Sequence, residues 1–130
     1  MRPSSYPALP AEYELLTEQL LDSLDDFADT TTGTWRERQA SIAALQAAIQ
    51  AWAAVGAHAA GADSLQSHSY ASRAVAMAQG HALLVGASLP VPDRVGAEIR
   101  ALTSKARACL LNERVAHRAE AAVPQQSPHS

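Results

Sequence analysis

Five histidines and one cysteine are the side chains of this 130-residue chain that are best suited to chemistry. The histidines are His58, His68, His81, His117 and His129. No two of them are four residues apart, the spacing that places two imidazoles of one helix on the same metal ion. The repeated E-x-x-H pattern of di-iron helix bundles is also absent. Because only 5% of the residues are aromatic, little is left to line a cofactor pocket. The sequence therefore predicts neither a metal site nor a cofactor.

One histidine lies in a segment that has a known counterpart. The segment Gln79 to Leu89, which contains His81, resembles the phosphotransfer-histidine segment of four-helix HPt domains. In that family a lysine and a glycine follow the histidine within the next turn; here no lysine follows, and Gly86 stands one position late. The resemblance implies a phosphotransfer module that uses His81. The alternative is a buried or interface histidine, because His81 shares a helix side with Met77 and Leu84.

Cys109 is the only cysteine, so it cannot form a disulfide within the chain. A nucleophilic cysteine needs a base nearby, and His117 is about 12 Å away along the same expected helix at 1.5 Å per residue. The sequence has no glycine-rich phosphate loop and no G-x-S-x-G motif. We therefore expect a protein that is not an enzyme, with Cys109 as a small apolar residue of the core.

Charged residues form two stripes with helical spacing. Basic residues at intervals of seven, extended by one further arginine, share one side of the last expected helix: Arg100, Arg107, Arg114 and Arg118. A similar acidic stripe on the first expected helix comprises Glu14, Glu18, Asp22 and Asp25. One interpretation is that the stripes pair with each other, each exposed pair contributing about 0.2–1 kcal/mol. The other is that the arginines bind an external anion, either nucleic acid or an acidic partner.

Between these stripes the chain is almost uncharged. From Gln39 to Pro92 there are 54 residues and two formal charges, Asp63 and Arg73. A solvent-facing helix of a monomer normally carries lysine and glutamate, so we expect this surface to be covered by another protein or a second copy. The expected interface residues are an alanine face with three anchors: Ala40, Ala44, Ala47, Ala48, Ala51, Tyr70, Met77 and Leu84. The alternative is that the alanines are only helix formers on a weakly polar surface.

Helices must position all of these side chains. Alanine, the strongest helix former, occupies 29 of the 130 positions, and no long stretch alternates apolar and polar residues. Apolar spacing predicts four helices, which run from Pro10 to Asp29, from a Thr34–Glu37 capping box to between Gly56 and Gly61, from Ser67 to Ala87, and from Pro92 to Ala122. The expected fold is all-α, a four-helix up-and-down antiparallel bundle with a long C-terminal helix. Residues 10–122 form this domain, 1–9 a flexible segment and 123–130 a disordered tail.

Two details of the expected core can be checked directly. The core stripe of the second helix comprises Trp35, Ile42, Leu45, Ile49 and Trp52. The apolar seam of the last helix ends at Leu110, so its last three turns should project beyond the bundle or fray.

The composition limits the classes of function that this protein can have. A net charge of −3 argues against general nucleic-acid binding. One cysteine, no apolar signal-like region and no apolar run of about 20 residues favour a cytoplasmic protein outside the membrane. We expect a protein that acts by protein–protein contact, such as an accessory chaperone, an adaptor or an inhibitor encoded by a mobile element, either as a homodimer or in a heteromeric complex. Anion binding and phosphotransfer stay as alternatives.

Overall fold

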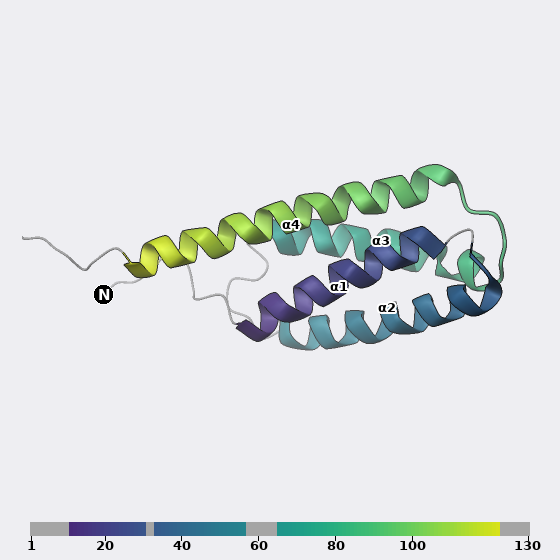
Figure 1. Ribbon diagram of the computed structural model, residues 1–130, viewed down its shortest axis with the longest axis horizontal. Helices are drawn as coiled ribbons and strands as arrows, with labels where there is room; N and C mark the ends of the chain where they lie inside the picture. Colours follow the sequence, from purple (N-terminus) through teal and green to yellow (C-terminus); the bar gives the residue numbers. More distant parts are fainter. Residues whose placement is uncertain (1–10, 31–32, 57–64, 123–130) are drawn as a thin grey trace, which may run out of the picture.

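The computed structural model describes residues 11–30, 33–56 and 65–122, with side chains up to residue 116. Within these ranges the chain forms four helices and no strand: α1 (Ala11–Asp29), α2 (Trp35–Gly56), α3 (Gln66–Gly86) and α4 (Asp93–Ala122). They pack as the expected up-and-down antiparallel bundle (Figure 1). The end segments predicted as flexible or disordered, 1–9 and 123–130, lie outside the described residues.

Local sequence signals set the ends of two helices. The predicted capping box opens α2: the Thr34 N–H donates to Glu37 Oε1 at 2.9 Å, and the Glu37 N–H donates to Thr34 Oγ1 at 3.2 Å. At the end of α3, Ser88 takes a left-handed conformation (φ 60°), and the Leu89 N–H donates to the Leu84 carbonyl at 2.8 Å. This six-to-one bond is that of a Schellman motif, which satisfies a terminal carbonyl and turns the chain toward α4.

The core is built around α1. Its side chains include five of the largest fully buried residues, which are Tyr13, Leu20, Leu21, Leu24 and Phe27. From α4, Val95, Ile99, Ala106 and Leu110 are buried along the predicted seam. Cys109 is half-buried beside that seam.

Trp35 corrects one prediction, because its side chain is 61% exposed rather than part of the core. In α2 only Leu45 and Trp52 among the large apolar residues are buried, while Ile42 and Ile49 are half-buried against the core. Trp35 stands seven residues before Ile42 and so shares its side of the helix. This side flanks the core, because α2 leans toward α1 and directs Leu45 and Trp52 inward.

The last turns of α4 project beyond the bundle, as its interrupted seam predicted. The helix has 30 residues, against 19 in α1 and 21 in α3. Its C-terminal end reaches past the ends of the other three helices (Figure 1).

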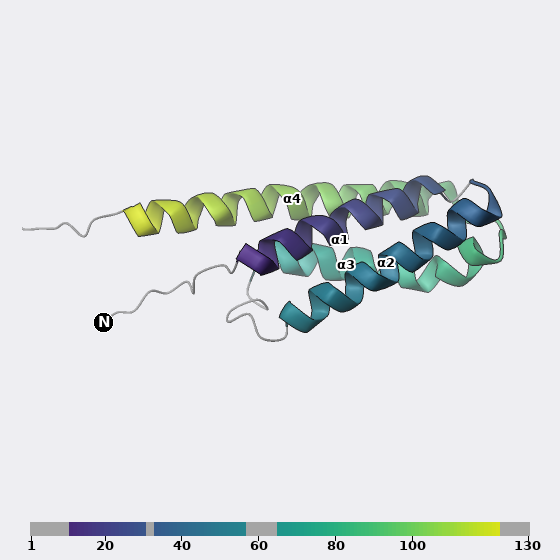
Figure 2. The ribbon, with the colours of Figure 1, turned by 60° about the horizontal axis from the view of Figure 1, so that its bottom comes forward.

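The four helices do not pack equally. α3 packs closely on α4, and α2 packs closely on α1, but α2 and α3 make few contacts with each other. In the view of Figure 2, α2 crosses in front of α3 at the edge of the bundle. The edge between α2 and α3 is thus the most open side of the bundle.

Candidate protein-interaction groove

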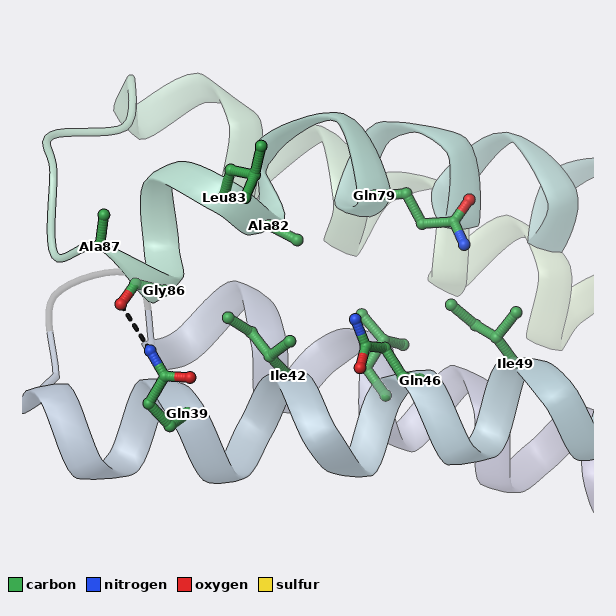
Figure 3. Close-up of a pocket in the computed structure, with 10 residues that line it drawn as sticks. Gln39, Ile42, Gln46, Ile49, Gln79, Ala82, Leu83, Gly86 and Ala87 are labelled. Carbon is green, nitrogen blue, oxygen red and sulfur yellow. Dashed lines mark hydrogen bonds between the residues drawn. The ribbon is translucent and has the colours of Figure 1, made fainter.

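A groove with a volume of about 630 Å³ lies between α2 and α3. Ile42, Gln46 and Ile49 rise from α2 toward α3, while Gln79 and Ala82 point from α3 toward α2 (Figure 3). The remaining lining residues are Gln39, Leu45, Leu83, Gly86 and Ala87. None of these side chains is charged, so the groove has an apolar floor and a rim of glutamine amides.

One end of the groove is closed by a contact between the two helices. The Gln39 side-chain amide donates to the Gly86 carbonyl at 2.5 Å (Figure 3). A Cβ atom at Gly86 would lie 3.2 Å from Ile42 Cδ1 and 3.3 Å from Gln39 Nε2, so glycine permits this approach. The groove lies between this contact and the stacking of His68 on Trp52 near the other end of the two helices.

The predicted alanine face lies on the side of α2 away from the groove, because Ala40 and Ala44 each stand two residues from Ile42 on the helix. Ala40, Ala44, Ala47 and Ala51 are exposed, and Ala48 is half-buried against the core. From Gln39 to Gly56 this helix has no charged residue. The groove and the alanine face are therefore two separate uncharged surfaces of α2.

The three predicted anchors on α3 lie elsewhere. Tyr70 is half-buried, and its ring is covered by the Arg73 guanidinium at 5.5 Å and the Lys105 ammonium of α4 at 5.7 Å. Met77 and Leu84 follow at intervals of seven, so they share the α4 side of α3. The structure thus places the alanines and these anchors on opposite flanks, and the helical residues of α3 that line the groove are Gln79, Ala82, Leu83 and Gly86. In the sequence, Ile42 and Ile49 are the residues that could have indicated these positions, because their apolar side chains need a facing surface on α3.

Three arginines of the stripe pair with acidic residues of α1. Arg100 pairs with Asp29, Arg107 with Asp22 and Asp25 at 2.7 and 2.6 Å, and Arg114 with Glu18 at 2.7 Å and Glu14 at 3.4 Å. These pairs are what the first interpretation of the stripes predicted. An external anion would have to displace carboxylates from these three guanidinium groups, while the side chain of Arg118 lies outside the described residues.

The arginine pKa values reflect this pairing. Burial lowers the pKa of Arg107, but hydrogen bonds to Asp25 and Asp22 outweigh burial and raise it. For Arg114, the hydrogen bond to Glu18 is the main cause of a raised pKa.

A polar cluster lies at the other end of the bundle, and sequence patterns did not predict it. His68 of α3 stacks on Trp52 at a centroid distance of 4.6 Å, and its Nδ1 lies 2.7 Å from the Tyr13 hydroxyl. The Trp52 indole N–H donates to Thr17 Oγ1 at 3.1 Å. These four side chains come from three helices, α1, α2 and α3, so only the fold brings them together.

Neither His81 nor Cys109 has a geometry that activates it. His81 is half-buried, and its Nδ1 is buried without a hydrogen-bond partner among the described residues. Burial raises the pKa of the Cys109 thiol, and the negative charge of Glu113 raises it further. A raised thiol pKa leaves less of the reactive thiolate near neutral pH.

No cluster of three metal-ligating side chains occurs within the part of the chain that the structure describes. Over the same residues, no helix has the length and apolar character that a membrane span requires. Comparison with protein-family models, curated proteins and solved structures found no match for this chain.

Proposed function

We propose that this protein acts without catalysis, by binding another polypeptide through the uncharged surface of α2 and α3. The groove between Ile42 and Ala82 is the observation that carries the proposal, since its apolar floor is open and uncharged. Grooves of this kind accept apolar side chains of an added helix. The alanine face, on the other side of α2, permits a second helix to approach closely.

Exposed large side chains support the same surface. Leu83 is 86% exposed at the groove rim, and Trp35 is 61% exposed one turn before Gln39 on the same side of α2. Tryptophan is enriched among the residues that dominate binding energy at interfaces. An accessory chaperone, an adaptor and a mobile-element-encoded inhibitor would all act through such a contact, in the cytoplasm, where an unpaired thiol stays reduced.

Site-specific photo-cross-linking in the native cell tests this proposal. p-Benzoylphenylalanine in place of Leu83 should yield polypeptide adducts on irradiation, because the probe lies at the groove rim. The matched control is the same probe in place of Leu15, which is 54% exposed on α1. Adducts at position 83 that are absent or weaker at position 15 support the proposal. No adduct at 83, or equal adducts at both positions, would overturn it.

A further inference from the structure

Resting on the proposed function, we infer that the polypeptide bound in this groove is a second copy of the chain. The two copies are related by a twofold axis, and the Leu83 side chain of each copy enters the groove of the other. The inference depends on three properties of the surface: a projecting side chain beside the groove, the absence of charge, and sufficient area.

The projecting side chain stands directly beside the groove. Leu83 belongs to the groove lining, yet its side chain is 86% exposed and points away from α2 (Figure 3). It therefore does not fill the groove of its own copy. In a twofold dimer the same patch meets itself, so a patch must carry both a projection and a hollow. The rim of this groove carries both.

The absence of charge in the groove limits which polypeptide surfaces can bind there. The groove lining has no charged side chain, and α2 has none after Arg38. A charged side chain buried there would have no ionic partner and would lose its hydration. Among the described helices, α1 and α4 expose charged residues along their length, whereas α2 has none from Gln39 onward and α3 has only Arg73, which lies over the Tyr70 ring. The same surface of a second copy meets this requirement without any unpaired charge.

The surface is also large enough. The uncharged part of α2, from Gln39 to Gly56, has 18 residues and is about 27 Å long at 1.5 Å per residue. Two helices side by side, with axes 8–10 Å apart, present a width of about 20 Å. The resulting projected area of about 540 Å² becomes larger when side-chain relief is included, toward the roughly 800 Å² per partner of a stable interface. The rim glutamines can form hydrogen bonds across the twofold axis.

Sedimentation velocity of the purified full chain over a range of concentrations tests the inference. We expect a dimer of twice 13.7 kDa. Its dissociation constant should change less than about threefold between low and high salt, because no ion pairs form the contact. Leu83→Asp should raise the dissociation constant about a hundredfold, since the dimer then buries two unpaired carboxylates.

The matched control is Leu15→Asp, an equal change at an exposed leucine of α1, which should leave the dimer intact. Because Leu83 is mostly exposed, Leu83→Asp should keep the helical circular dichroism of the parent chain. A monomeric parent chain, an unaffected Leu83→Asp dimer, or equal loss in both variants would overturn the inference. If the parent is monomeric while the cross-linker at 83 captures a different protein, only the second copy is excluded. If the cross-linker captures nothing, the proposed function fails as well.

Discussion

Thr17 shows how a single hydroxyl joins two helices of this bundle. Its Oγ1 donates to the Tyr13 carbonyl at 2.7 Å within α1 and accepts the Trp52 indole N–H at 3.1 Å from α2. Thr17 is fully buried and Trp52 is 5% exposed, so water does not replace either bond. A buried donor left without an acceptor costs about 1–3 kcal/mol. The Thr17 hydroxyl thus fixes how α2 sits on α1.

Thr17→Val should lower the free energy of unfolding by about 1–3 kcal/mol, because valine has the same shape but leaves the Trp52 N–H unsatisfied. The control is the same change in a Trp52→Phe background, where no indole N–H needs an acceptor. There, Thr17→Val should cost at least about 1 kcal/mol less. Urea unfolding followed by circular dichroism measures all four members of this cycle. An equal cost in both backgrounds would show that the bond contributes nothing.

Among contacts between single residues, the sequence predicts those that depend on helical spacing alone. Thr34 and Glu37 are three residues apart, so their reciprocal capping bonds follow from local geometry. Arg100, Arg107 and Arg114 recur every seven residues, so their pairing with α1 follows once the two helices are neighbours. The bond between Trp52 and Thr17 spans 35 residues, and no spacing rule connects them.

Among the elements, α3 begins with a cap that comes from another helix. Leu65, the residue before its first turn, makes no side-chain capping bond. Instead Glu113 of α4 accepts hydrogen bonds from the Ser67 N–H at 3.2 Å and from the Ser67 hydroxyl. A carboxylate at this position also interacts favourably with the positive end of the helix dipole. The start of α3 is therefore tied to the register of α4.

Glu113→Ala should loosen the first turn of α3. Loss of a capping interaction costs about 1 kcal/mol, so the amides near Ser67 should exchange with solvent roughly five- to tenfold faster. Hydrogen exchange read by mass spectrometry resolves this turn. Glu98→Ala is the control, because Glu98 is also on α4 and is exposed. Unchanged protection near Ser67, or equal loss in both variants, would contradict this role of Glu113.

The helix boundaries were largely predictable from the sequence, but the tilt of the helices relative to one another was not. The capping box and Pro92 placed the starts of α2 and α4 to within a residue. Periodicity also grouped Trp35, Ile42 and Leu45 on one core stripe. A stripe wide enough to hold all three residues faces partly toward the core and partly beside it. The lean of α2 toward α1 decided that Leu45 faces the core and that Ile42 lines the groove. Such a tilt depends on packing against three other helices.

Over the whole molecule, stability is distributed unevenly among the helices. α1 buries five large apolar side chains completely, whereas α2 buries only Leu45 and Trp52 among its large apolar residues. Burial of one such side chain contributes about 1.5–3 kcal/mol. α2 also lacks close support from α3 along the groove. The helix that carries the proposed interface is thus the helix least supported by its own bundle.

Amides in the middle of α2 should therefore open at lower free energy than those in the middle of α1, by at least about 2 kcal/mol, the burial of one large side chain. Native-state hydrogen exchange of the Leu83→Asp variant measures this in a monomer, where no second copy covers α2.

In the parent chain the same amides should gain protection as concentration rises, because a partner that binds only the closed state stabilises it by mass action. The centre of α1 is the internal reference and should change less. Equal protection of both helices in the monomer would contradict the uneven distribution. If the protection of α2 in the parent chain does not depend on concentration, only helices of the same bundle protect it.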